Sequence, residues 1–368
     1  MYRVRNGFAS RTGVVVAGGC IGLVAVGLQK FGNPANMGIC VACFSRDIAG
    51  ALGLHRAAVV QYLRPEIPGL ILGALTSALV FGEFRARAGA MPLIRFLLGA
   101  LAVIGALVFL GCPWRTALRL AGGDANAVVG LGGLVSGIFI AARLFIAGYD
   151  PGPARRAPRV VGAVMPTLAL GALLLLVVSG RGEATATSGG LFFSSKGPGA
   201  MRAPVWLSLG AGLCIGGLLQ RSRFCTIGGI RDLILFRQGH LAWGAVGLVG
   251  AALLANLALG QFHPGFREQP IAHHDAVWNF LGMLLAGLAF TLAGGCPGRQ
   301  CVLAGEGDAD AGLFVLGMLV GAAFAHNFGL AATPAGVSRS AQVAVVAGIA
   351  ICIGLGVLIR GSQPAEES

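Results

Sequence analysis

Two short cysteine-containing motifs each occur twice in this chain. The first, Cys-x5-Arg-Asp, begins at Cys40 and again at Cys225, and the second, Gly-Cys-Pro-x-Arg, has its cysteine at Cys112 and again at Cys296. The two motifs are 72 positions apart in the first copy and 71 in the second, so the copies lie in register half a chain apart. Thiols bind soft partners. A small residue at a tight turn is the alternative explanation, but glycine or alanine would serve there equally well, so the pattern predicts four thiols on a shared pathway.

Each motif also carries an arginine. The four are Arg46, Arg115, Arg231 and Arg299. A guanidinium keeps its charge, so at membrane depth it must be paired or face water, which makes it a functional candidate. Four thiols and four guanidiniums together suit a small anion that carries a soft atom. For Arg46 and Arg231 the alternative is a structural ion pair with Asp47 or Asp232, and a structural role also remains open for Arg115 and Arg299.

A third match follows the second motif in each copy. Asp124 and Asp308 each lie 12 residues after the preceding motif cysteine and begin the sequence Asp-Ala-x-Ala. Because aspartate readily caps a helix, we expect these two residues to be caps and not ligands.

The composition places the chain in a membrane. It is 56% apolar and 11% charged, with a mean hydropathy of +0.80, whereas about a quarter of the residues of a soluble domain are charged. The net charge of +13 does not indicate a nucleic-acid partner, because the basic residues are scattered between apolar stretches. An ATP-driven pump is also disfavoured, since neither lysine, Lys30 or Lys196, follows a glycine as in the phosphate-binding loop.

The apolar stretches predict an all-α polytopic membrane protein with about ten transmembrane helices. We expect them near residues 12–31, 66–84, 93–111, 127–147, 160–179, 204–220, 240–260, 277–295, 311–331 and 341–360. The motif segments near residues 38–53, 113–122, 225–236 and 296–304 are too short to cross the hydrocarbon, so we expect four short re-entrant helices.

The repeat predicts four parts of the chain. Residues 1–150 form a first repeat of four spans and two re-entrant cysteine segments, and residues 151–203 form a linking span and an extracytoplasmic loop. Residues 204–335 form the second repeat, and residues 336–368 the final span and a C-terminal tail. The period is five crossings, and an odd period turns the second copy upside down. Inverted repeats of this kind are typical of transporters with a site near the midplane.

The second motif predicts where its cysteine lies. Proline is tolerated in the first turn of a helix, so Pro113 and Pro297 are expected to begin short helices, with Cys112 and Cys296 at their N-terminal ends. There the free amides and the helix dipole favour anions.

Basic residues gather in the segments that would share a side with the N-terminus. They include Arg3, Arg5, Arg11, Arg85, Arg87, Arg155, Arg156, Arg159, Arg221, Arg223 and Arg237. The positive-inside rule then predicts that both termini are cytoplasmic.

The duplicated motifs resemble those of the YeeE/YedE family of sulfur-transport membrane proteins, and within it the YedE-like putative selenium transporters. The resemblance implies an hourglass-shaped inner-membrane permease in which cysteine-bearing segments meet at a constriction and pass a thiosulfate-like anion through S–H···S contacts. It carries over to Cys40, Cys112 and Cys296, with Cys225 added by the repeat, and less securely to Arg115 and Arg299. It also implies a cytoplasmic TusA-like sulfur-carrier protein as partner.

The main expectation is therefore a non-enzymatic permease without cofactor or bound metal, which takes up a small anion of sulfur or selenium. Two alternatives stay open. One is a membrane thiol-redox protein, because Cys40 and Cys43 have the Cys-x-x-Cys spacing of disulfide oxidoreductases. The other is a soft-metal transporter with cysteine ligands, although the nearby arginines would repel a cation.

Overall fold

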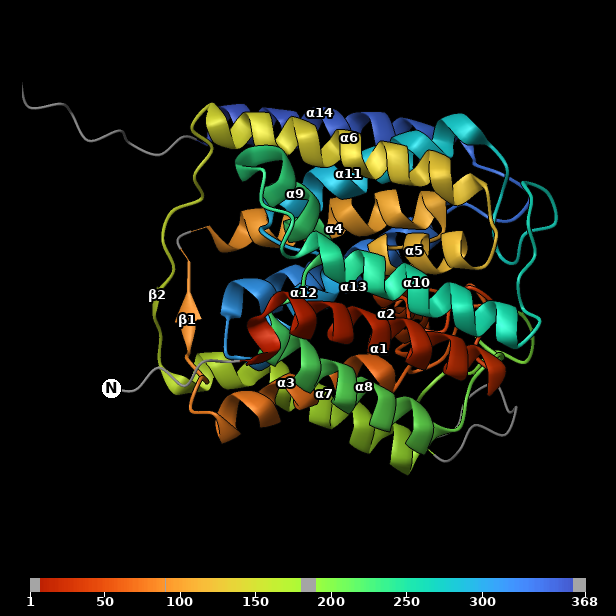
Figure 1. The fold of residues 1–368 in the computed structure, drawn as a ribbon, viewed down its shortest axis with the longest axis horizontal. Coiled ribbons are helices and arrows are strands. Elements are labelled where there is room, and N and C mark those ends of the chain that lie inside the picture. Colours follow the sequence, from red (N-terminus) through yellow and green to blue (C-terminus); the bar gives the residue numbers. More distant parts are fainter. Residues whose placement is uncertain (1–6, 90, 180–189, 360–368) are drawn as a thin grey trace, which may run out of the picture.

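The computed structural model describes residues 7–89, 91–179 and 190–359. These residues form one short 3-10 helix, η1 (Gly7–Ala9), and fourteen α-helices. A pair of two-residue strands, β1 (Arg87–Ala88) and β2 (Arg155–Arg156), is antiparallel. The prediction of an all-α polytopic membrane protein is confirmed (Figure 1).

Ten of the helices are long, and each lies where a span was expected. They are α1 (Arg11–Lys30), α3 (Glu66–Val80), α4 (Pro92–Phe109), α6 (Asn126–Ile146), α7 (Arg159–Val178), α8 (Val205–Ser222), α10 (Ala242–Ala258), α11 (Ala276–Leu292), α13 (Ala309–Asn327) and α14 (Arg339–Leu358). Within the described residues, seven helical segments are long and apolar enough to cross a membrane, two of them formed by α4 with α5 and by α11 with α12. The other three expected spans, α3, α8 and α10, are outside that set and stay predictions.

The four remaining helices are short and lie at the four motif segments. They are α2 (Val41–Ala51), α5 (Pro113–Ala121), α9 (Thr226–Phe236) and α12 (Pro297–Gly305). Every residue of α2 is buried, and all but one of α5. At 1.5 Å per residue, helices of 9 to 11 residues cannot cross a bilayer.

Each copy packs mainly against the other copy (Figure 1). In the first copy α1 contacts α10 and α3 contacts α8, and likewise α4 contacts α13 and α6 contacts α11. By position in the repeat, α8 is the counterpart of α1, and α10 is the counterpart of α3. The repeat therefore relates the α1–α10 pair to the α8–α3 pair, so that the two copies exchange helix partners. Glycine allows the close approach, since a Cβ at Gly18 of α1 would collide with the backbone of Gly244 in α10.

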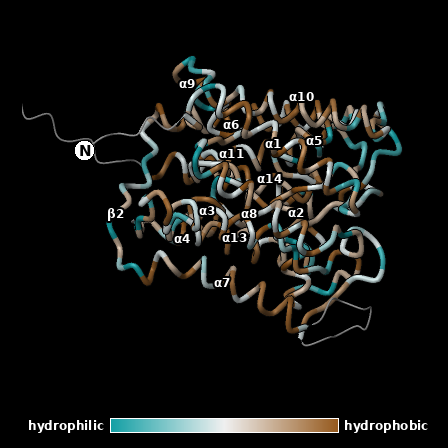
Figure 2. The backbone as a smooth tube through the Cα atoms, turned by 60° about the horizontal axis from the view of Figure 1, so that its bottom comes forward, coloured by the Kyte–Doolittle hydropathy of each residue, from teal (hydrophilic) through white to brown (hydrophobic). Residues whose placement is uncertain are grey.

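Polar residues lie mainly at the two ends of the helix bundle. Figure 2 shows hydrophilic segments at the ends and around β2, and hydrophobic colouring along helices such as α7. At the end that holds β1, ion pairs connect the two copies. Glu83 bonds to Arg221 and Arg223, and Arg87 pairs with Asp308. This end of the bundle therefore holds the copies together by charge as well as by packing.

Candidate functional site

All four motif cysteines are N-cap residues of the short helices. The prediction that Pro113 and Pro297 begin helices is confirmed, because α5 and α12 start at these residues directly after Cys112 and Cys296. Cys40 and Cys225 hold the same position before α2 and α9. Each sulfur therefore lies at the positive end of a helix dipole, beside amides that have no partner within the helix.

Three of the four sulfurs cap their own helix. Cys40 accepts the amide of Cys43 at 3.4 Å, Cys225 that of Gly228 at 3.3 Å, and Cys296 that of Arg299 at 3.4 Å. Cys112 makes no such side-chain cap. The sulfur of Cys112 instead faces Cys40, which begins the first motif of the same copy.

The structure brings the cysteines together in two pairs, one in each copy. The thiol of Cys40 donates to the sulfur of Cys112, with 3.6 Å between the two sulfurs. In the second copy the backbone amide of Cys296 donates to the sulfur of Cys225 at 3.3 Å. Cys225 is 5% exposed and the other three are fully buried. A soft anion that passed here would meet sulfur from both motifs at once.

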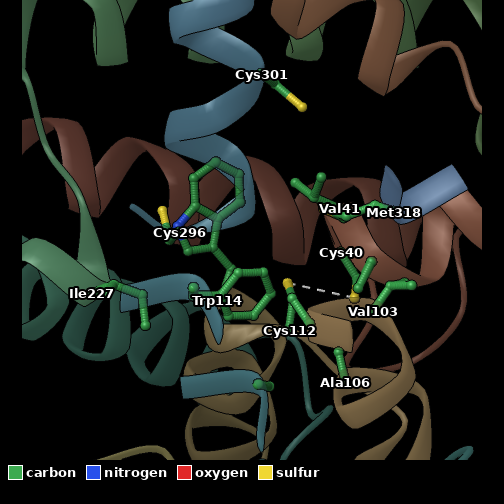
Figure 3. Packing of buried hydrophobic residues seen from close by; sticks show 14 of the residues in the cluster. Cys40, Val41, Val103, Ala106, Cys112, Trp114, Ile227, Cys296, Cys301 and Met318 are labelled. Atoms are coloured by element: carbon green, nitrogen blue, oxygen red, sulfur yellow. Dashed lines mark hydrogen bonds between the residues drawn. The ribbon is translucent and has the colours of Figure 1, made fainter. Parts of the chain in front are cut away.

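Trp114 lies between the two pairs. It occupies the variable position of Gly-Cys-Pro-x-Arg in the first copy, where the second copy has Gly298. A Cβ at Gly298 would collide with the Trp114 indole, so the ring packs directly on that glycine. Figure 3 shows Trp114 between Cys112 and Cys296, with Cys40 beyond Cys112. The two copies thus touch through the same motif position.

The guanidinium of Arg115 lies next to the first thiol pair. Its guanidinium is fully buried and donates to the sulfur of Cys43 at 3.6 Å. The other donors go to backbone carbonyls, namely those of Leu110, Asn36 and Ile271, with a longer contact to Pro270. Among the ion pairs of the described residues, none includes Arg115. Its positive field is therefore not cancelled by a carboxylate.

The other three motif arginines are in ion pairs. Arg46 binds Asp47 at 2.7 Å in the interior, and Arg231 binds Asp232 at 2.8 Å in a half-exposed position. Arg299 contacts Glu306 at 3.3 Å. For Arg46 and Arg231 the structure shows the ion-pair alternative, formed within each motif.

The two repeated aspartates have partly different roles. Asp308 is the N-cap of α13 and accepts the amide of Ala311 at 3.0 Å, so the expected cap is confirmed. The N-cap of α6 is Ala125, so the expected cap at Asp124 is wrong, and Asp124 instead accepts the amide of Asn126 at 2.9 Å. Both aspartates also pair with an arginine, Asp124 with the buried Arg119 and Asp308 with Arg87, each at 2.6 Å.

Two residues of this region, Arg64 and Glu306, were missed from the sequence. Arg64 binds the second oxygen of Asp47 at 2.8 Å, and Glu306 accepts from Arg223 at 2.6 Å. Neither Arg64 nor Glu306 belongs to a duplicated motif. The position equivalent to Glu306 in the first copy is Gly122, for example. A search based on the repeat therefore could not find these residues.

The site offers thiols but no metal-binding cluster. All nine cysteines are free, and in the described part of the chain no three His, Cys, Asp or Glu side chains are grouped to hold a metal ion. What the arrangement can do is accept and donate weak hydrogen bonds at sulfur, at the N-terminal ends of four helices and beside the guanidinium of Arg115, which has no carboxylate partner among the described residues.

Comparison with known proteins bears on this region. Residues 221–359 match the family model described as sulphur transport. This part of the chain is similar to the members of that family. It contains Cys225, Arg231, Cys296 and Arg299. The family resemblance expected from the motifs is thus confirmed, and the selenium subgroup stays a prediction.

A curated relative gives further information. The thiosulfate transporter TsuA of Spirochaeta thermophila is 31% identical over 103 residues, which are 28% of this chain. The match spans about a third of the relative, 31% of its length.

Proposed function

We propose that this protein is a membrane permease for a small sulfur- or selenium-containing anion, of which thiosulfate is the best candidate. The observation that carries the proposal is the pairing of motif cysteines at helix N-termini, with Cys40 and Cys112 3.6 Å apart and both buried. The family match and the thiosulfate transporter relative support a sulfur anion as substrate.

Substrate and site fit each other in charge and in softness. The terminal sulfur of thiosulfate accepts hydrogen bonds from thiols, and its oxygens accept from the free amides of the helix N-termini. Arg115 offsets part of the anion's desolvation cost. No covalent step is required, since each thiol keeps its proton and hands the anion to the next by exchange of hydrogen bonds.

We further propose that the two copies are inverted in the membrane and that the thiol pairs of the two halves lie in series along one path. The exchanged pairing of α1 with α10 and α3 with α8 supports a two-fold relation. With five crossings in each copy, that axis would lie in the membrane plane. Reporter fusions at residues 1 and 368 test the expectation that both termini are cytoplasmic.

The deciding experiment is uptake of labelled thiosulfate by proteoliposomes. We expect Cys40→Ala, Cys112→Ala and Cys296→Ala to lower uptake by ten-fold or more while membrane insertion is unchanged. Cys352→Ala is the matched control, because Cys352 is equally buried but lies in α14. Uptake that survives all three single changes would remove the thiols from the path. Competition by selenite in the same assay compares selenium with sulfur.

The thiol-redox alternative is distinguished by its chemistry. A redox centre formed by Cys40 and Cys43 must cycle between thiols and a disulfide, whereas the permease keeps both thiols reduced. Alkylation of the purified protein with and without reductant separates the two. A TusA-like carrier on the cytoplasmic side rests on the family resemblance alone.

A further inference from the structure

Trp114 breaks the two-fold relation at the point where the copies meet. The second motif has tryptophan at its variable position in one copy and glycine, Gly298, in the other. The indole lies in the space that a side chain at 298 would need. Between the two thiol pairs, the Trp114 ring therefore packs on the backbone of Gly298. Two tryptophans at this motif position would collide, and two glycines would leave a cavity.

The ring carries an unused polar group. Trp114 is 2% exposed, and its indole nitrogen has no hydrogen-bond partner among the described residues. A buried N–H normally finds an acceptor, and leaving it unpaired costs free energy. The side chain is held between Cys112 and Cys296 (Figure 3). The missing acceptor is therefore expected to be a transported anion located between the two thiol pairs.

A second unused donor lies in the same region. Thr226 directly follows Cys225 and is buried, and its hydroxyl has no partner within the described part of the chain. Its counterpart in the first copy is the apolar Val41. Both unsatisfied donors therefore occur at positions where the copies differ, and each is within two residues of a motif cysteine.

We propose that the Trp114 indole N–H, assisted by the Thr226 hydroxyl, binds an oxygen of the anion while the thiols hold its soft atom. This proposal rests on the proposed function and adds to it the substrate class, an anion that has both a soft atom and at least one oxygen. Thiols alone accept any soft anion. A fixed N–H donor between them favours an oxyanion, because an anion without oxygen leaves the donor unpaired.

The test uses proteoliposomes with labelled thiosulfate and three kinds of variant. Trp114→Phe keeps an aromatic ring and removes the donor. Benzothienylalanine at position 114 keeps the bicyclic shape and replaces the N–H by sulfur, and Thr226→Val gives the second copy the residue of the first. Trp278→Phe in α11 is the control for tryptophan replacement, and Cys112→Ala for loss of the path.

Loss of a hydrogen bond to a charged group corresponds to about a 10- to 100-fold loss of uptake. We expect this loss for both changes at position 114, a smaller one for Thr226→Val, and none for Trp278→Phe. If the benzothienyl protein transports like the original, the ring and not its donor matters, and the proposal is overturned. Normal uptake by Trp114→Phe overturns it as well.

Fluorescence separates this proposal from the proposed function. A protein that keeps Trp114 but has Trp206, Trp243 and Trp278 changed to Phe should change its emission when thiosulfate is added. If the original protein does not transport thiosulfate and the single-tryptophan variant does not change its emission, both proposals fail. If the original protein transports thiosulfate, Cys112→Ala does not, and the position 114 variants transport as fast as the original, the proposed function stands and the role of Trp114 is refuted.

Discussion

The thiol of Cys40 donates to the sulfur of Cys112 across 3.6 Å, although 72 positions separate the two residues in the chain. This distance is longer than a disulfide but needs only a small movement to close. We therefore expect a mild oxidant to form a bond between Cys40 and Cys112 and to block uptake, and a reductant to restore it. Mass spectrometry of digested protein identifies the link. Cys43→Ala should still form it, whereas a protein in which only Cys43 becomes linked would contradict the observed pairing.

The Arg-Asp motif should matter for stability in the first copy and hardly in the second. Asp47 is fully buried and binds both Arg46 and Arg64, so Asp47→Asn leaves two buried guanidiniums without a carboxylate. We expect a loss of about 3–5 kcal/mol in the free energy of unfolding. Asp232 is 24% exposed beside Arg231, and Asp232→Asn should cost about 0–1 kcal/mol. Unfolding in detergent measures both, and equal losses would refute the difference.

Replacement by lysine should lower the amount of folded protein at Arg115 but not at Arg299. The guanidinium of Arg115 reaches several carbonyls in different directions, and an ammonium cannot reproduce that fork. Arg115→Lys is expected to reduce the amount of folded protein several-fold. Among the described residues, the guanidinium of Arg299 bonds to the carboxylate of Glu306 alone, and lysine can replace that ion pair. Size-exclusion profiles of the two variants at equal expression give the comparison, and a normal profile for Arg115→Lys would be the contrary result.

Two loop histidines should make stability depend on pH. Burial lowers the pKa of His55 and of His273 below the ordinary 6.5. Each ring accepts a backbone amide at Nδ1, from Ala57 and Asp275, so Nε2 carries the proton and donates to the carbonyl of Arg46 or Val108. Protonation at Nδ1 would break this arrangement.

The sign follows from the unfolded state. Below pH 6.5 an unfolded histidine binds a proton that the folded one does not, so stability falls as the pH falls from 6.5 towards the lowered pKa values. The melting temperature should therefore rise between pH 5 and pH 7. His55→Gln and His273→Gln should each flatten the rise. A slope unchanged in the double variant would show that other groups are responsible.

Much of the fold could be predicted because hydrophobic length and the repeat are local signals. All ten expected spans and all four short segments coincide with helices, and the span ends differ by at most four residues. The proline after Cys112 and Cys296 was enough to predict that each of these cysteines precedes a helix.

The pairing within the site could not be predicted in the same way. Which carboxylate meets Arg299 depends on the C-terminal end of α12, where Glu306 has no counterpart in the other copy. The repeat suggested four equivalent arginines, but Arg115 is bound by carbonyls from the distant segment at residues 270–271. Such contacts arise from tertiary packing, which neither hydropathy nor duplication encodes.

The exchange of helix partners affects how the protein must be assembled. The apolar face of α1 is covered by α10, whose first residue lies more than 200 positions later in the chain. During synthesis the early helices therefore enter the lipid long before their partners exist. An isolated first half would expose these glycine-lined faces, and only two halves, on one chain or on two, can cover them.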